Sequence, residues 1–328
     1  MTPPALPPFA SLLKSRDVED PINLWVHRPL AYALVAAVYR TPVTPNQITL
    51  LSGLCGLIAG TLWIFAAETI GSEDSLLALR LGGVFLWLSA IVDGADGILA
   101  RAKSLQSDFG RAIDGAMDAI VAIATIFPGG YYIYREAGEP WVIGLCFAAL
   151  LITLPDIVLY DFYKESFLRV TRPGRGGEGE DPASVEAKYE ALIRAGGAWT
   201  TRWAVRFGLL PLLRAQQDYV RWTNPQALGR LRELVGTETS AQIYRKHNRT
   251  AMRLWSFLSL APHCYLFAIT AILGHPIVYV WIRLLVMGPL LMVTLVMQRR
   301  ATRATLKELE EVGVLGGVPD PAPLGAEG

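Results

Sequence analysis

The long apolar stretches of this 328-residue chain constrain its fold more than any other feature. Each is near the ~20 residues with which an α-helix crosses the hydrocarbon core of a bilayer. Inside a bilayer every backbone N–H and C=O must be hydrogen-bonded within the protein, so such stretches fold as helices. Hydrophobic residues make up 52% of the chain and charged residues 18%, which argues against an ordinary soluble domain. The sequence therefore predicts an all-α polytopic membrane protein with six transmembrane helices, at residues 46–67, 78–100, 110–132, 140–161, 251–273 and 276–297.

The charges of the connections predict the orientation of these helices. The connections at 101–111, 164–172 and 245–253 each carry several Lys or Arg residues, whereas loop 68–77 carries only acidic charge. Basic loops stay on the cytoplasmic side, so both termini should lie at the cytoplasmic face of the cell (inner) membrane. The formal net charge of +1 gives no reason to expect a nucleic-acid partner, and none is predicted.

Polar segments divide the rest of the chain. Residues 12–40 alternate apolar and charged side chains, which predicts an amphipathic helix in the membrane interface with Trp25 as an anchor. The proline-rich residues 1–10 are expected to be disordered. The predicted segments are 1–40, the N-terminal tail and interfacial helix; 41–164, transmembrane helices one to four; 165–250, a helical cytoplasmic insert; 251–300, transmembrane helices five and six; and 301–328, a cytoplasmic tail.

The insert should be helical and lie on the membrane surface. Residues 184–195, 199–222 and 225–235 have amphipathic patterns rich in Trp, Leu and Arg. A flexible linker precedes them at 169–182. Its glycines, between Gly174 and Gly179, follow no predicted strand, so we interpret them as a loop rather than a dinucleotide-binding motif.

Other polar residues in or beside the predicted spans need an explanation. Arg283 is expected to snorkel to the interface, with a place along a substrate path or a pairing with a neighbouring residue as the alternatives. Asp156 could support a site or cap a helix end, and the sequence favours neither. His247 and His263 are isolated in sequence and are expected to be packed or solvated rather than catalytic.

Four carboxylates stand out at the boundary between the second and third predicted spans. Asp93 and Asp96 are three residues apart, and Asp114 and Asp118 are four apart, so each pair should lie on one helix face. Carboxylates beside the membrane core are costly and usually functional. Converging carboxylate oxygens suit Mg²⁺, Mn²⁺ or Ca²⁺ rather than zinc. A first ion held by Asp93, Asp96 and Asp114, and a second held with the help of Asp118, would follow.

The residues between the two pairs suit a phosphate ligand. Gly97 and Gly110 would let a ligand approach the helix backbone closely. Arg101 carries a guanidinium, whose planar donors match the geometry of phosphate oxygens. Together with the aspartates, these residues predict a site for a metal-bound diphosphate.

These positions also resemble a known family. Asp93-x-x-Asp96-Gly97-x-x-Ala100-Arg101, eight residues, Gly110-x-x-x-Asp114-x-x-x-Asp118 is similar to the signature of the CDP-alcohol phosphotransferases, with no departure at its eight positions. These are integral membrane enzymes of phospholipid and polar-headgroup synthesis. Asn46 and Thr49 resemble a further Pro-Asn-x-x-Thr element found near the nucleotide in that family.

The resemblance implies an activity and its participants. A CDP-linked donor, either CDP-diacylglycerol or a CDP-linked polar alcohol, would transfer a substituted phosphoryl group to an alcohol acceptor and release CMP. Two divalent ions, Mg²⁺ or Mn²⁺, would be bound by the four aspartates, and Asp118 would also act as the catalytic base. Membrane lipids are expected partners, and a homodimer is left open. The residues implied in nucleotide binding are Asn46, Thr49, Gly97, Ala100, Arg101 and Gly110.

A transporter and a nucleotide-binding protein without catalysis are the alternatives to an enzyme. A transporter can also carry carboxylates within the membrane, but here they cluster at one boundary rather than at the midplane. A member of the same fold that binds nucleotide without catalysis is a further alternative, against which the intact set of four aspartates argues. The sequence does not identify the donor or the acceptor.

Overall fold

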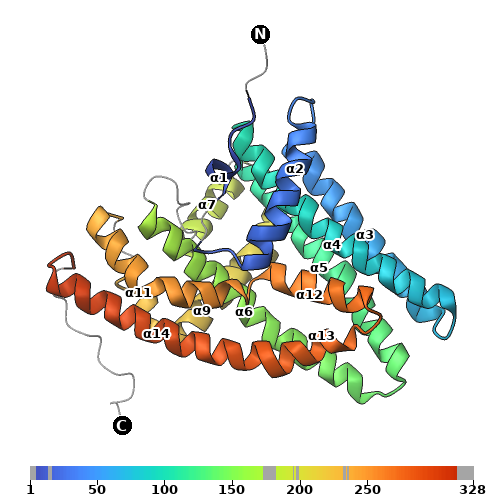
Figure 1. Ribbon diagram of the computed structural model, residues 1–328. Helices are drawn as coiled ribbons and strands as arrows, with labels where there is room; N and C mark the ends of the chain where they lie inside the picture. The colour runs from blue at the N-terminus through green and yellow to red at the C-terminus, as the bar shows by residue number, and fades with distance from the viewer. Residues whose placement is uncertain are drawn as a thin grey trace. The chain divides into compact units, whose positions relative to one another are not determined.

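The fold is known from a computed structural model (Figure 1), which describes residues 5–13, 17–172, 182–194, 196, 199–231, 234 and 236–315. The described residues form helices and no strand, which confirms the all-α prediction. Every predicted span overlaps a helical segment long and apolar enough to cross a membrane. The six segments are Pro45–Glu68, Glu73–Ala102, Ile113–Ala137, Trp141–Thr171, Glu238–Ile272 and Ile277–Glu311.

The chain forms two compact units, and their division differs from the five segments predicted above, which remain a prediction. Unit 1 comprises Met1–Ile157 and Trp255–Leu291, and unit 2 comprises Val158–Leu254 and Met292–Gly328. The elements of unit 1 are α1 (Phe9–Leu12), η1 (Asn23–His27), α2 (Arg28–Val38), α3 (Pro45–Glu68), α4 (Glu73–Ala102), α5 (Asp108–Ala137), the start of α6 (Trp141–Thr171), α12 (Leu260–Ile272), α13 (Ile277–Ile282), η3 (Arg283–Met287) and the first residues of α14 (Gly288–Glu311).

Polar caps define where the helices of unit 1 begin. At the start of α3, Thr44 Oγ1 accepts a hydrogen bond from the Gln47 amide, and Gln47 Oε1 accepts one from the Thr44 amide. Pro45 fills the first helical position, where no N–H is needed. Ser107 caps α5 by accepting from the Gly110 amide at 3.0 Å. These caps satisfy backbone N–H groups that would otherwise lack a partner at the helix starts.

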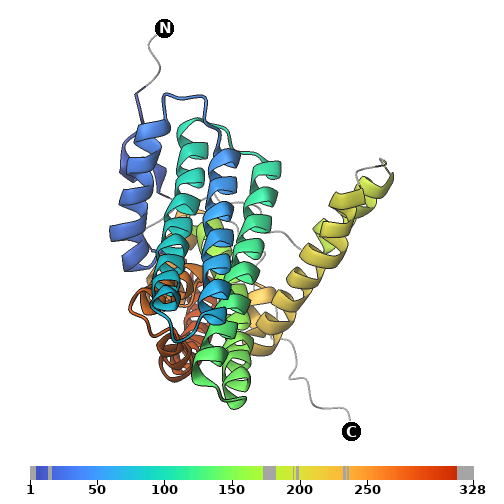
Figure 2. The same ribbon diagram turned by 90° about the vertical axis from the view of Figure 1, so that its right-hand side faces the viewer.

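Helix α3 lies between α4 and α5 (Figure 2) and packs tightly against both. The approach to α5 depends on Gly60, where an added Cβ would lie 1.8 Å from the Ala124 carbonyl oxygen. Small residues of this kind let membrane helices pack closely without a hydrophobic driving force between them. On the side of α4, the fully buried Trp63 donates from Nε1 to the Leu79 carbonyl at 3.0 Å.

The N-terminal segment is more ordered than predicted. Leu6 and Leu12 pack on a buried cluster that includes Ala31 and Leu99, and the Tyr32 hydroxyl donates to the Pro7 carbonyl. The prediction of disorder for residues 1–10 is therefore wrong for residues 5–10, because apolar side chains between the prolines find a surface on α2 and α4. Trp25 has an exposed fraction of 80%. Its role as an interfacial anchor stays a prediction.

The last two spans are interrupted helices. Helix α11 (Glu238–Ser256) ends before α12, so the fifth predicted span is not one continuous helix. Pro262, in the first turn of α12, has no N–H to donate to the preceding turn. In the sixth span, the π-helical turn η3 precedes Pro289. Irregular turns are common where a proline removes a backbone donor.

Unit 2 contains the predicted insert, and most of its described residues are helical. The predicted helix 225–235 ends at Leu228, after only one turn. The glycine-rich stretch from Gly174 to Gly179 lies outside the described residues. The placement of the insert at the cytoplasmic membrane surface stays a prediction. The insert helices are α7 (Pro182–Arg194), α8 (Trp199–Ala204), η2 (Val205–Leu209), α9 (Leu210–Thr223) and α10 (Pro225–Leu228).

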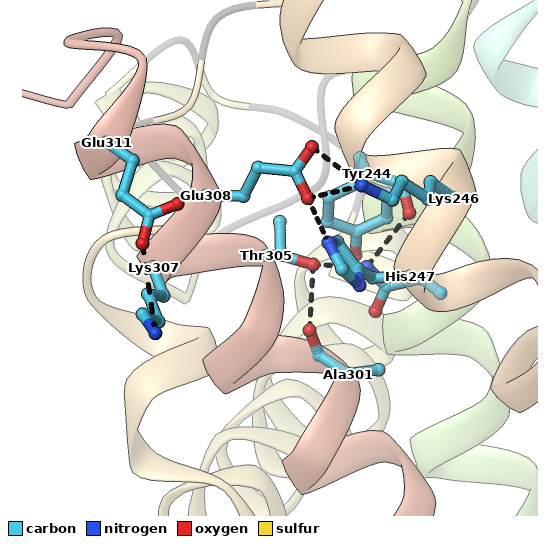
Figure 3. A network of polar contacts seen from close by, with 9 residues as sticks. Tyr244, Lys246, His247, Ala301, Thr305, Lys307, Glu308 and Glu311 are labelled. Carbon is cyan, nitrogen blue, oxygen red and sulfur yellow. Dashed lines mark hydrogen bonds and ion pairs between the residues drawn. The ribbon is translucent and has the colours of Figure 1, made fainter.

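Polar side chains join α11 to α14 within unit 2 (Figure 3). Asn248 Nδ2 donates to Thr305 Oγ1 at 2.8 Å and to the Tyr244 carbonyl at 3.0 Å. Glu308 accepts from Lys246 Nζ at 2.8 Å and lies 2.6 Å from His247 Nε2. His247 therefore has a structural partner, as expected of a packed residue.

Candidate active site

The end of α4 and the start of α5 bring three of the four aspartates together. Asp93, Asp114 and Asp118 each offer one carboxylate oxygen, and these oxygens lie within 4.8 Å of one another. All three side chains are partly buried. The connection of residues 103–107 reverses the chain between the two helices, as the short spacing in the sequence requires. Both sequence pairs therefore contribute to one cluster.

Asp96 is not in that group. Its carboxylate accepts a hydrogen bond from the Thr49 hydroxyl of α3, and its exposed fraction is 8%. Positions three apart on a helix differ in direction by about 60°, so Asp93 and Asp96 need not face the same neighbour. The sequence predicted Asp96 together with Asp93 and Asp114, whereas the structure places Asp118 with them.

The predicted nucleotide contacts lie at the ends of the same three helices. A Cβ at Gly110 would lie 3.4 Å from Asn46 Oδ1, so the starts of α3 and α5 are adjacent. Ala100 is partly buried, and its carbonyl accepts from the Leu105 amide at 2.9 Å. A Cβ at Gly97 would lie 3.3 Å from Arg101 Nη1.

Arg101 also has an anchor that the sequence did not suggest. Its Nε donates to the Leu12 carbonyl at 2.7 Å, so the N-terminal segment holds the side chain in place. The guanidinium keeps further N–H groups that make no hydrogen bond to the described residues. This leaves it able to contact a phosphate.

A second arginine was missed by the sequence analysis. Arg28 donates from Nε to Glu19 at 2.9 Å and from Nη1 to the Gly94 carbonyl at 3.2 Å. It lies within electrostatic range of Asp93. No spacing or motif links residue 28 to residue 94. The sequence places Arg28 among the charged residues of the amphipathic segment 12–40 and gives it no other role.

Arg283 does not snorkel, and that prediction is wrong. Its Nη2 lies 2.7 Å from Asp156 Oδ2, its Nε donates to Thr153 at 2.7 Å, and both charged side chains are fully buried. Asp156 lies within α6 rather than capping its end. His263 is packed, as expected, with Nδ1 3.0 Å from the Tyr279 hydroxyl. The Asp156 carboxylate compensates the buried charge of Arg283, so the guanidinium does not need to reach water at the interface.

The carboxylate cluster fits a divalent cation. Three negative oxygens this close repel one another in a partly buried setting, and a cation between them removes that repulsion. All three ligands are oxygens from carboxylates, a donor set suited to Mg²⁺, Mn²⁺ or Ca²⁺ and unlike the sulfur and nitrogen sets of structural zinc.

The fold and this cluster define a helical integral membrane protein with an acidic, cation-type site at adjoining helix ends. Residues 42–173 match the model of a family described as CDP-alcohol phosphatidyltransferase. The matched region includes all eight signature positions. The resemblance inferred from the sequence is confirmed.

Individual relatives agree with this assignment. The chain is 31% identical over 142 residues to a bifunctional IPC transferase and DIPP synthase of Rubrobacter xylanophilus, covering 41% of this chain and 28% of the relative. A protein of the same name from Thermococcus kodakarensis is 37% identical over 92 residues, or 26% of this chain and 18% of the relative. A phosphatidylinositol phosphate synthase of Mycobacteroides abscessus is 26% identical over 201 residues, or 60% of this chain and 84% of the relative. The matches to the two bifunctional proteins thus cover less than a third of their length.

Proposed function

We propose that the protein is a CDP-alcohol phosphotransferase of phospholipid or polar-headgroup synthesis. It would transfer a substituted phosphoryl group from a CDP-linked donor to the hydroxyl of an alcohol acceptor and release CMP. The observation that carries this proposal is the cluster of Asp93, Asp114 and Asp118 inside the region that matches the family.

In this proposal the four aspartates have two roles, metal binding and proton transfer. Asp93, Asp96, Asp114 and Asp118 would hold two divalent ions, Mg²⁺ or Mn²⁺, which would neutralise the diphosphate and make its phosphorus a better electrophile. Asp118 takes the proton of the acceptor hydroxyl. The acceptor oxygen then bonds to the phosphorus that carries the alcohol, the bond from that phosphorus to the bridging oxygen breaks, and CMP leaves with the bonding electrons.

The remaining predicted residues bind the donor in this proposal. Gly97, Ala100 and Gly110 leave room for the nucleotide against the helix ends, since none carries a bulky side chain. Arg101 contacts the diphosphate, and Asn46 and Thr49 flank the nucleotide at the start of α3. A location in the inner membrane with the site facing the cytoplasm follows from the basic connections beside it. Nucleotide-linked donors are found on that side.

The reaction class leaves the identity of the donor and of the acceptor to be determined by experiment. One relative is named for making phosphatidylinositol phosphate, which supports including phosphorylated inositol among the acceptors to be tested. Both CDP-diacylglycerol and CDP-linked polar alcohols belong in the donor panel.

Acceptor-dependent release of CMP tests the proposal. The purified chain would be incubated with Mg²⁺ or Mn²⁺, with CDP-diacylglycerol, CDP-choline, CDP-ethanolamine or CDP-inositol, and with a panel of alcohols, and products followed by mass spectrometry. Asp114→Asn should abolish release, whereas Glu68→Gln, an exposed carboxylate that pairs with Arg135, should not change it. No release from any pair, together with solute flux in liposomes, would instead favour a transporter.

A further inference from the structure

Arg28 is held beside the carboxylate cluster by the N-terminal segment. Its side chain is 15% exposed, and the Glu19 carboxylate that receives its Nε is 5% exposed. The Asp20 carboxylate accepts a hydrogen bond from the backbone N–H of Asn23 at 3.0 Å, which fixes the turn between Glu19 and the helix that carries Arg28. The guanidinium therefore has a defined place rather than a range of surface conformations.

The Arg28 guanidinium lies against the face of α4 that carries Gly94 and Gly97. An added Cβ at Gly94 would lie 3.6 Å from Arg28 Nη1, and one at Gly97 would lie 3.3 Å from Arg101 Nη1. Residues 94 and 97 are three apart, so the two guanidiniums lie along one helix face. Each is anchored from the N-terminal segment, Arg28 by Glu19 and Arg101 by the Leu12 carbonyl.

The two guanidiniums suit an anion that bridges them. Arg28 and Arg101 are within electrostatic range of each other. The nearby Glu19 and Asp96 carboxylates act on Arg101 in the opposite sense. The features that favour a phosphate are therefore the hydrogen-bond donors that the two guanidiniums keep. An arginine has five N–H donors, and the hydrogen bonds of Arg28 to Glu19 and Gly94 use its Nε and one N–H of Nη1. Glu19 orients one edge of the guanidinium and leaves donors for a phosphate, which arginine binds with two parallel hydrogen bonds.

We propose that Arg28 is a phosphate-binding residue that forms, with Arg101, a two-arginine clamp on a substrate phosphate at the carboxylate cluster, and that Glu19 positions Arg28. This inference rests on the proposed function. The phosphate oxygens could come from the diphosphate of the CDP-linked donor or from a phosphorylated acceptor, and both present the same chemistry to a guanidinium.

Ligand binding without turnover tests the clamp. The full chain in detergent with Mg²⁺ would be titrated with CDP and with cytidine by calorimetry. Arg28→Ala should weaken CDP binding about 10- to 100-fold, the loss of a charge-assisted hydrogen bond, and leave cytidine binding unchanged. Arg28→Lys should lose less, since it keeps the charge without the planar donors, and Glu19→Gln should lose less again. Arg135→Ala, which removes an arginine paired with Glu68 instead, is the matched control.

Kinetics separate the two phosphate sources. A raised donor KM with an unchanged acceptor KM assigns the donor diphosphate. A raised KM for phosphorylated acceptors only, with CDP binding unchanged, assigns the acceptor phosphate. The clamp is overturned if folded Arg28→Ala changes neither CDP affinity nor either KM by more than about twofold; if that variant does not fold, Arg28→Lys and Glu19→Gln decide in the same way. Failure of the proposed function is a separate result, in which the unmodified protein binds CDP but releases no CMP with any acceptor.

Discussion

Asp96 and Asp118 lie in different surroundings, so substituting each of them should impair a different step, donor binding or turnover. Asp118 lies in the carboxylate cluster, whereas Asp96 is held by the Thr49 hydroxyl. Asp118→Asn should keep donor binding and lose turnover by the ~10²–10⁴-fold expected for a general base. Asp96→Asn should instead weaken donor binding. Calorimetry with the donor and single-turnover rates give the two quantities. If both variants lose donor binding equally, Asp118 has no separate role as base.

His27 predicts a pH dependence of stability. Its side chain is 2% exposed and its ring packs against Trp87 and Tyr265. Burial, and secondarily the charge of Arg28, lower the pKa of His27 from 6.5 to about 4. The folded protein therefore keeps His27 neutral, while the unfolded chain takes up a proton below about pH 6.5, so this contribution to stability is full above pH 6.5 and is lost as the pH falls toward 4.

The measurement for His27 is thermal unfolding in detergent. Between pH 7 and pH 5 the unfolding temperature of the wild type should fall more steeply than that of His27→Phe, which has no group to titrate. Parallel pH profiles for the two proteins would show that His27 does not contribute.

The buried pair of Arg283 and Asp156 predicts a large effect of single substitutions. Asp156→Leu leaves Arg283 fully buried without its charge partner, which should destabilise unit 1 by about 3–5 kcal/mol. Adding Arg283→Met should recover much of this loss, because no uncompensated charge remains. Chemical denaturation of the wild type, the two single variants and the double variant measures the coupling. Additive losses in the double variant would argue against a paired charge.

At the scale of helices, the contact between α3 and α5 depends on a glycine. Gly60→Ala would place a Cβ 1.8 Å from the Ala124 carbonyl, so the helices must separate, at a cost of about 1–3 kcal/mol or more. Gly130→Ala is the control, since a Cβ there meets nothing within 4 Å. Unfolding temperatures should fall for the first variant only. An unchanged value for Gly60→Ala would mean that the two helices can separate at little cost.

At the scale of the whole molecule, the distribution of basic residues predicts its orientation. In a background without Cys55, Cys146 and Cys264, a cysteine replacing the exposed Asp74 should react with an impermeant reagent applied to intact cells. A cysteine replacing the exposed Ala187 should react only after the membrane is opened. The opposite result would place the carboxylate cluster on the outer side, away from its proposed donor.

The sequence by itself determined the helical membrane fold and proposed most residues of the candidate site. Long apolar stretches specify the membrane-spanning helices, because a helix forms all of its backbone hydrogen bonds within the segment and needs no water. The four-residue spacing of Asp114 and Asp118 places their side chains on the same helix face. Only the tertiary structure decided which aspartates converge, that Arg283 pairs with Asp156, and that Arg28 lies against Gly94. These contacts join residues distant in the chain, and no local period or propensity specifies them. They form because a buried charge or donor must find a partner wherever packing brings one.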